Sequence, residues 1–308
     1  MTHHHPAAGD GAAPRPFGRL LTAMVSPFTP DGSLDLDGAA ALAAHLVDEQ
    51  GNDALVVNGT TGESPTTTDA EKERLIRTVV EAVGDRARVV AGVGTNDTRH
   101  TIELAGAAEK AGAHGLLVVT PYYNKPPQAG LVRHFTAVAD ATGLPVMLYD
   151  IPHRSGVAIA TETLVRLAEH ERIVAVKDAK GDLVATSWVT SRTDLAVYSG
   201  EDALTLAALG IGGVGLVGTS THLTGALTKR MIEAYDRGET AEALALHRRL
   251  LPLFTGIFRT QGTILVKAAL TAQGLPAGPV RPPLVDATEA EIAQLREDCA
   301  AAGLELPA

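Results

Sequence analysis

A single cysteine, few aromatic residues and no excess of positive charge characterise this sequence of 308 residues. The one cysteine, Cys299, cannot form an intramolecular disulfide, which suits a reducing compartment such as the cytoplasm. The net charge of −10 argues against a nucleic-acid or anionic-membrane partner, since either would need a basic surface. No apolar run reaches the length of a membrane span. We therefore expect a cytoplasmic protein with no nucleic-acid or membrane partner.

The remaining composition is that of a globular protein with an ample core, because 45% of the residues are hydrophobic and 20% are charged. The length allows one large α/β barrel or two ordinary domains. Residues 1–17 are rich in proline, glycine and alanine and show no periodicity, so we expect a flexible tail there. They lack a basic region followed by an apolar core, so we expect no secretory signal.

Eight short apolar runs alternate with helical patterns along the chain. They lack clean polar alternation, which is typical of parallel strands that are buried on both faces. The runs cover residues 20–28, 54–58, 87–94, 115–121, 145–152, 173–179, 195–200 and 214–220. A closed sheet of this kind is an α/β fold, the (β/α)8 or TIM barrel, which we predict over residues 18–238. A small C-terminal region over 239–308 is predicted to hold three helices, at 240–260, 262–273 and 287–302.

The predicted strand at 173–179 carries an unusual lysine. Side chains alternate along a strand, so Ile173, Ala175 and Lys177 share one apolar face. A buried ammonium is costly, burial lowers the pKa of lysine, and a neutral lysine amine attacks carbonyl carbon. Lys177 is thus a candidate Schiff-base lysine. The alternative is a lysine at a strand end that reaches solvent or pairs with Asp178.

Polar residues gather at the C-terminal ends of the predicted strands, where a (β/α)8 barrel carries its chemistry. They occupy residues 59–64, 120–124, 149–156 and 199–202. This clustering favours a catalytic Lys177. Residues 59–64 are either a tight turn that caps a helix or a nest of N–H groups and hydroxyls for a carboxylate.

Two further side chains at these ends have a purely structural interpretation as well. Tyr123, next to Tyr122, could be a packing aromatic. Arg154 is either a surface arginine or a planar fork that grips a carboxylate through two hydrogen bonds.

A glycine pattern at 210–215 fits G-x-G-x-x-G, but it does not indicate a dinucleotide site. A dinucleotide site needs a strand, then the glycines, then a helix, and here a helical pattern precedes the glycines and a strand follows them. The sequence also has no HExxH motif and no cysteine pair. We therefore predict no cofactor and no metal.

Four motifs together resemble the dihydrodipicolinate synthase/N-acetylneuraminate lyase family of class I pyruvate-dependent aldolases. The resemblance runs over nearly the whole chain after the tail. The motifs are GTTGES (59–64), TPYYNKPP (120–127), YDIPHRSG (149–156) and VAVKDAKG (174–181). GTTGES and Arg154 resemble the synthase branch, which condenses pyruvate with aspartate 4-semialdehyde on the diaminopimelate route to lysine.

The resemblance implies four catalytic residues. Lys177 would form an imine with pyruvate, and Tyr149 would carry protons beside it. Thr61 and Tyr123 would complete a hydroxyl relay to solvent, with Tyr123 reaching across a tight dimer interface into a neighbouring site. The family also implies a homotetramer built from such dimers, and a reaction without cofactor or metal because the iminium is the electron sink.

The substrate-binding residues are implied in the same way. Thr60 and Thr61 would hold the pyruvate carboxylate, and Arg154 would hold the carboxylate of aspartate semialdehyde. Gly200 and Val217 match positions whose main chain lines the pocket.

Two departures from the family pattern matter. The strand at 214–220 is more polar and richer in glycine than the branch leads us to expect. At the positions of the family's allosteric lysine site, Asp69, Lys72 and His100 replace the usual histidines and glutamate, so we predict weak or absent feedback by lysine. Two alternatives stay open: a sister aldolase acting on a 2-keto-3-deoxy sugar acid, and a catalytically idle barrel paralogue.

Overall fold

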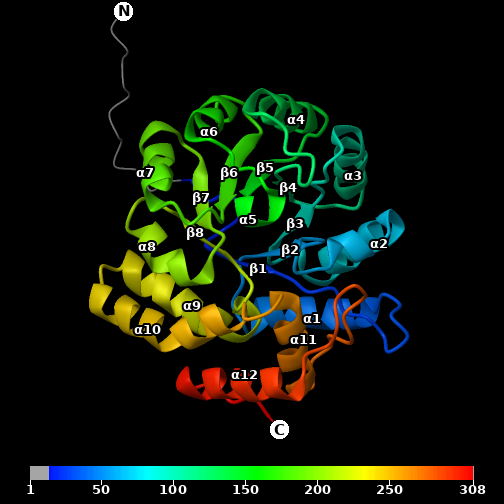
Figure 1. The fold of residues 1–308 in the computed structure, drawn as a ribbon, viewed down its shortest axis with the longest axis vertical. Coiled ribbons are helices and arrows are strands. Elements are labelled where there is room, and N and C mark those ends of the chain that lie inside the picture. The colour runs from blue at the N-terminus through cyan, green and yellow to red at the C-terminus, as the bar shows by residue number, and fades with distance from the viewer. Residues whose placement is uncertain (1–13, 308) are drawn as a thin grey trace, which may run out of the picture.

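A closed barrel of eight parallel strands forms the centre of the computed structural model, which describes residues 14–307 (Figure 1). Each strand pairs with the next one along the chain, and β8 pairs back with β1. The strands are β1 Leu20–Ala23, β2 Ala54–Val57, β3 Arg88–Gly92, β4 Gly115–Val119, β5 Val146–Asp150, β6 Ile173–Asp178, β7 Ala196–Ser199 and β8 Gly215–Gly218. The predicted fold class is confirmed, although each strand is shorter than its predicted run.

Helices surround the barrel, and a group of three follows it. The surrounding helices are α1 Leu36–Asp48, α2 Asp69–Val83, α3 Thr98–Lys110, α4 Gln128–Asp140, α5 Pro152–Ser155, α6 Thr161–Leu167, α7 Leu183–Arg192, α8 Thr205–Leu209 and α9 Thr221–Asp236, with short 3₁₀ turns η1 Ser64–Thr66 and η2 Asp202–Leu204. The last three are α10 Thr240–Gly256, α11 Gly262–Ala272 and α12 Glu289–Ala301. Figure 1 shows α10 beside α9, and α12 across α10 and α11. Within residues 14–307, no helix combines the length and apolarity needed to span a bilayer.

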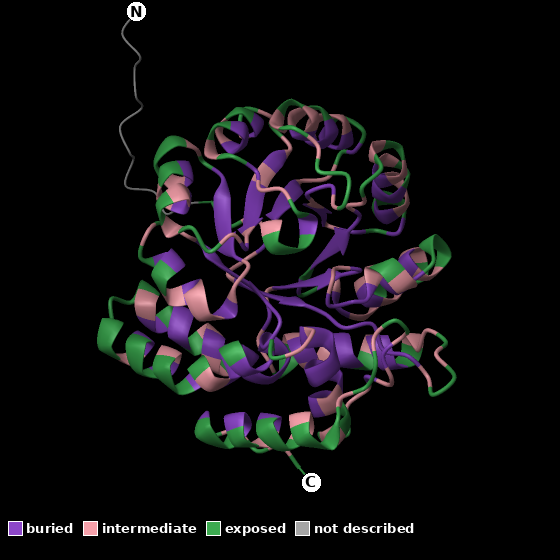
Figure 2. Cartoon of the chain, in the orientation of Figure 1, coloured by how far each residue is buried: buried purple, intermediate pink, exposed green. Residues whose placement is uncertain are grey.

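The strands are buried on both faces, as Figure 2 shows by their colour. Their outward side chains pack against the helices and form the larger core, to which Leu55, Leu116 and Leu148 belong. Their inward side chains fill the barrel and mix small residues, such as Ala54 and Ala175, with large ones, such as Met147 and Tyr198. Burial on both faces explains why the strands read as continuous apolar runs.

Phe17 closes the N-terminal end of the barrel, so the expectation of a tail is wrong for this residue. Its side chain is 1% exposed, and its N–H donates to the Tyr198 hydroxyl at 3.3 Å. The same hydroxyl donates to the Gly18 carbonyl at 2.9 Å. Residues 1–13 of the predicted tail lie outside the described residues. The predicted boundary after residue 238 falls between α9 and α10, and a division into separate domains there stays a prediction.

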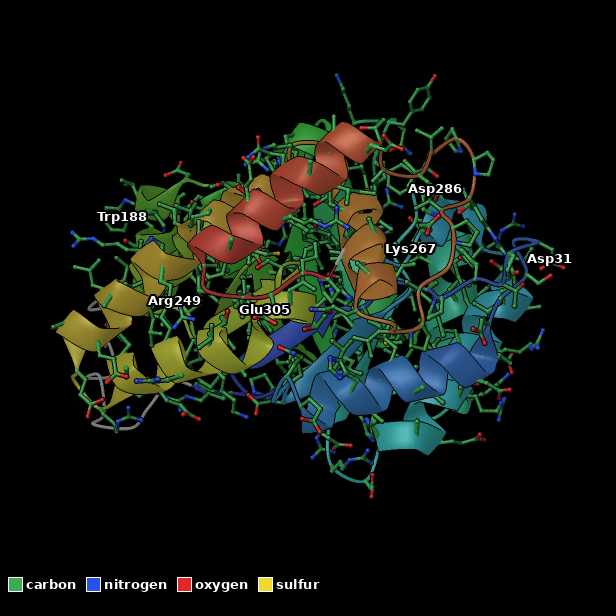
Figure 3. The ribbon with its side chains drawn as sticks, turned by 90° about the horizontal axis from the view of Figure 1, so that it is seen from below. Asp31, Trp188, Arg249, Lys267, Asp286 and Glu305 are labelled. Atoms are coloured by element: carbon green, nitrogen blue, oxygen red, sulfur yellow. The ribbon has the colours of Figure 1, made fainter. Side chains whose placement is uncertain are left out.

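A buried ion pair fastens the C-terminal helices to the loop after β2. The Lys267 Nζ on α11, marked in Figure 3, lies 2.6 Å from a Glu63 carboxylate oxygen, and both side chains are at most 3% exposed. The other Glu63 oxygen accepts the Arg281 N–H at 2.8 Å, and Lys267 Nζ donates to the Pro279 carbonyl at 2.8 Å. Thus α11 and the connector that follows it hold the turn at 59–64 in place.

Removing the cation alone should destabilise the protein. Lys267→Met leaves the Glu63 carboxylate buried without its partner, which costs about 3–5 kcal/mol in the free energy of unfolding. Urea denaturation measures this loss. The matched control is Glu63→Gln/Lys267→Met, which removes both charges and should lose less. A Lys267→Met midpoint equal to that of the unaltered chain would contradict this account.

Candidate active site

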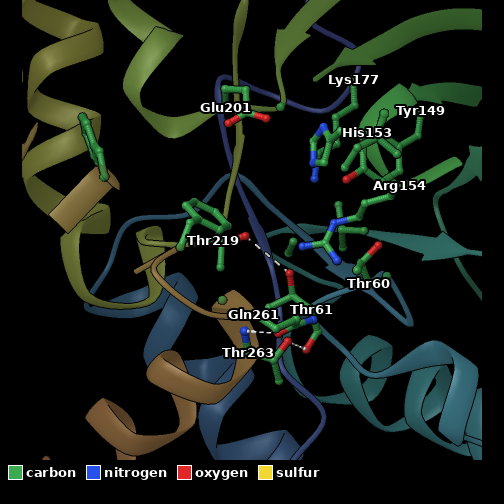
Figure 4. Close-up of a pocket in the computed structure, with 18 of the residues that line it drawn as sticks. Thr60, Thr61, Tyr149, His153, Arg154, Lys177, Glu201, Thr219, Gln261 and Thr263 are labelled. Atoms are coloured by element: carbon green, nitrogen blue, oxygen red, sulfur yellow. Dashed lines mark hydrogen bonds between the residues drawn. The ribbon is translucent and has the colours of Figure 1, made fainter. Parts of the chain in front are cut away.

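A cavity of about 470 Å³ opens at the C-terminal ends of the strands, within the range of small-molecule sites (Figure 4). One part of its wall comes from strand ends and the loops that follow them. The other part is a cap from α10, α11 and the loop between them, which contribute Phe254, Phe258, Gln261 and Thr263. The cavity is thus shaped by segments far apart in the sequence.

Lys177 extends from β6 into this cavity. Its side chain is 5% exposed, and Nζ lies 4.4 Å from the centre of the Tyr149 ring. Burial lowers the pKa of Lys177 to about 8, although the negative charges of Asp202 and Glu201 oppose the shift. A substantial fraction of this amine is therefore neutral near pH 8, as a nucleophile requires.

The alternative of a snorkelling or Asp178-paired lysine is wrong. Asp178 follows Lys177 directly and so points to the opposite face of the strand. Its carboxylate accepts the Thr186 hydroxyl at 2.6 Å and the Lys180 N–H at 3.0 Å. Lys177 forms no ion pair with any residue of the described range.

Tyr149 stands beside Lys177 because β5 and β6 are in register at these two residues. Its side chain is 5% exposed. Burial raises the pKa of the Tyr149 phenol, and the Arg154 charge and the Thr60 hydroxyl oppose the rise only in part. The phenol therefore stays protonated at neutral pH and can donate a hydrogen bond into the cavity.

The turn at 59–64 presents Thr60 and Thr61 to the cavity. Glu63 holds a left-handed backbone conformation, with φ of +54°, and its N–H donates to the Thr60 carbonyl at 3.1 Å. The Thr61 hydroxyl lies 3.4 Å from the Thr219 hydroxyl, and the Thr263 hydroxyl donates to the Thr61 carbonyl at 2.9 Å. Both contacts are drawn in Figure 4. Thr219, directly after β8, and Thr263, on α11, thus hold the turn in place.

Arg154 belongs to α5, the single helical turn that follows β5. It lines the same cavity, and within residues 14–307 its guanidinium has no hydrogen-bonded or ion-paired partner. A free planar fork of donors in a cavity suits a carboxylate ligand.

The structure places two predicted residues elsewhere. Tyr123 is 89% exposed and lines a neighbouring cavity instead of the one that holds Lys177. Val217 is fully buried in the barrel interior and does not line the cavity, whereas Thr219, two residues further along, does. Gly200 lines the cavity as predicted, and its N–H donates to the Asp178 carbonyl at 2.8 Å.

The neighbouring cavity brings together all seven positions that match the family's lysine site. These are Ser64, Pro65, Asp69, Lys72, Asn96, His100 and Tyr122. His100 Nε2 lies 2.9 Å from the Asp69 carboxylate, and Lys72 Nζ donates to the Thr67 carbonyl at 2.5 Å. Weak feedback by lysine stays a prediction.

Several residues of the Lys177 cavity have no role predicted from the sequence. Glu201 belongs to the polar strand end at 199–202. Thr219 could have been found from strand alternation, because it shares a face with Val217. No sequence motif indicates Gln261 or Thr263 as site residues, since only the packing of the C-terminal helices brings them to the barrel.

Known proteins share this arrangement. The dihydrodipicolinate synthetase family matches residues 16–302. The chain belongs to that family. It is 74% identical over 290 residues to the 4-hydroxy-tetrahydrodipicolinate synthase of Acidothermus cellulolyticus, with 94% of each chain covered.

Solved structures of the dihydrodipicolinate synthetase family superpose closely. The enzyme from Cyanidioschyzon merolae with lysine bound gives a TM-score of 0.92 at 46% identity, covering 94% of this chain and 100% of that one. The enzyme from Acinetobacter baumannii complexed with pyruvate gives a TM-score of 0.90 at 33% identity, covering 94% of this chain and 99% of that one.

The low pKa of Lys177 predicts a specific labelling profile in this family member. Because only the neutral amine reacts, labelling of Lys177 by a small amine-directed reagent should rise with pH and be half-maximal at about pH 8. An ordinary lysine is half-deprotonated near 10.4. Competitive labelling followed by peptide mapping measures the midpoint. A midpoint near the ordinary value would contradict the buried, neutral amine.

Proposed function

We propose that this chain is a 4-hydroxy-tetrahydrodipicolinate synthase, a lyase that condenses pyruvate with aspartate 4-semialdehyde on the diaminopimelate route to lysine. One observation carries the proposal: the buried amine of Lys177, with a pKa of about 8, lies against a protonated tyrosine in a small-molecule cavity. The 74% identity to a synthase supports the choice within the family.

The first stage is imine formation. Neutral Lys177 attacks the keto carbon of pyruvate, and the hydroxyl of the resulting adduct leaves as water. Tyr149 passes protons between the attacking amine and the leaving oxygen, as its position beside Nζ allows. Thr60 and Thr61 hold the pyruvate carboxylate with the N–H groups and hydroxyls of their turn.

The second stage forms the carbon–carbon bond. The protonated imine draws electrons from the pyruvate methyl group, which loses a proton and becomes an enamine carbon. That carbon attacks the aldehyde of aspartate semialdehyde, whose carboxylate binds Arg154. The substrate amine then attacks the imine carbon, closes the ring and displaces the Lys177 amine. The iminium serves as the electron sink, so we propose a reaction without metal or cofactor.

Assembly bears on the same site. We propose a homotetramer built from tight dimers, in which Tyr123 reaches the neighbouring site and joins the relay with Thr61. The 89% exposure of Tyr123 supports this role. Val184 and Trp188, which are 71% and 58% exposed on α7, offer a second, separate apolar surface for the other interface. We also propose that the enzyme acts in the cytoplasm.

Feedback by lysine is proposed to be weak or absent. Lys72 places an ammonium in the cavity that matches the family's effector site, where it would repel the amino groups of free lysine. A lysine titration that gave strong inhibition at low concentration would contradict this.

A coupled assay tests the proposed function. The enzyme should turn over pyruvate with aspartate semialdehyde and should be inactive with 2-keto-3-deoxy sugar acids. Turnover of the sugar acids alone would indicate the sister aldolase instead. Turnover of neither, by a folded protein, would indicate an idle paralogue.

Loss of the Tyr149 hydroxyl should slow the reaction. Tyr149→Phe removes the proton carrier and should lower kcat by about 10²-fold or more, the range that general acid–base catalysis supplies. Tyr235→Phe is the control, because its hydroxyl donates to the Leu209 carbonyl outside the cavity, and it should retain activity. A near-normal rate for Tyr149→Phe would rule out this role.

A further inference from the structure

Glu201 is a charged residue of the cavity that the mechanism above does not use. It follows β7, lines the cavity and is only partly exposed. Within residues 14–307, no group donates a hydrogen bond to its carboxylate and no cation pairs with it. Burial raises the pKa of Glu201, and the nearby charges of Lys177 and Arg154 oppose that rise.

The backbone of Glu201 is fixed although its side chain is free. Its carbonyl accepts the Ser199 hydroxyl at 2.7 Å and the Leu204 N–H at 3.1 Å. The adjacent Asp202 differs, because its carboxylate accepts the Ser220 hydroxyl and the N–H groups of Thr219 and Ser220. The Asp202 carboxylate is thus fully engaged in structural hydrogen bonds. The Glu201 carboxylate is unpaired within residues 14–307, although hydrogen bonds fix its backbone.

The position of Glu201 relative to Arg154 is informative. Arg154 follows β5, Lys177 lies on β6 and Glu201 follows β7, and these three strands are neighbours in the barrel. Lys177 is therefore flanked by one unpaired cation and one unpaired anion. Figure 4 shows the Glu201 carboxylate and the Arg154 guanidinium facing the same space from different sides.

We propose that Glu201 is a specificity-determining residue that binds the α-ammonium group of the amino-acid aldehyde while Arg154 binds its carboxylate. This rests on the proposed function, in which the second substrate is aspartate semialdehyde. That substrate carries both charges on one carbon, at the end opposite the aldehyde. A site with one cation and one anion beside Lys177 matches this zwitterion, whereas an aldehyde with a carboxylate alone would leave Glu201 unpaired.

A comparison of two aldehydes distinguishes binding of the ammonium group by Glu201 from a general electrostatic effect of Glu201 on the site. Succinic semialdehyde has the same carbon chain, aldehyde and carboxylate as aspartate semialdehyde but no amino group. Glu201→Gln keeps the shape and removes the charge. It should raise the KM for aspartate semialdehyde about 10- to 100-fold, the worth of a charged hydrogen bond. The inhibition constant of succinic semialdehyde should stay within about 2-fold of its value in the unaltered enzyme, because this aldehyde has no ammonium group that Glu201 could bind.

Two further variants complete the test. Glu201→Asp retains the charge and should recover part of the affinity for aspartate semialdehyde. Glu169→Gln removes an exposed carboxylate in the turn that follows α6, outside the cavity lining, and should leave both constants unchanged. Glu201→Gln should still form the pyruvate imine, trapped by borohydride at a pH above the Lys177 pKa of about 8, which also shows that the variant is folded.

The outcomes are distinct. An unchanged KM for aspartate semialdehyde in Glu201→Gln would overturn the assignment. Equal changes for both aldehydes would also overturn it, because Glu201 would then act on catalysis in general and not on the ammonium group. An unaltered enzyme that does not turn over aspartate semialdehyde would overturn the proposed function itself, and the assignment with it.

Discussion

Desolvation of one amine, that of Lys177, sets the chemistry of the cavity. An ammonium at Lys177 loses its water shell inside the barrel, and no carboxylate among residues 14–307 pairs with it directly. The cost of burying the charge therefore shifts the balance toward the neutral amine. The closed barrel surrounds the Lys177 side chain, which is 5% exposed. The same burial raises the pKa of the Tyr149 phenol and keeps it protonated, so burial at one site prepares both the nucleophile and the proton carrier.

Strand alternation separates chemistry from structure at the ends of β5 and β6. Tyr149 and Lys177 point inward, whereas the next residues, Asp150 and Asp178, point outward. Asp150 lies 3.2 Å from Lys180 Nζ and accepts the Ile159 N–H at 3.1 Å. The outward carboxylates thus anchor the loops that follow these strands. The inward side chains remain free of such contacts and are available to substrate.

The barrel and its central lysine could be predicted from the sequence because both depend on local patterns. Buried parallel strands read as short apolar runs, and a lysine on such a run is conspicuous. Phe17 could not be assigned, because composition marked its segment as a tail and only the packing at the barrel end shows otherwise. Gln261 and Thr263 reach the site through the docking of α10 and α11, which no local pattern encodes.

The covalent bond between Lys177 and pyruvate is the central claim, and borohydride trapping tests it most directly. The protein is incubated with pyruvate, reduced, digested and mapped by mass spectrometry. We expect one pyruvyl adduct on the peptide that contains Lys177, and none in Lys177→Ala. An adduct on another lysine, or no adduct at all in the folded protein, would contradict it.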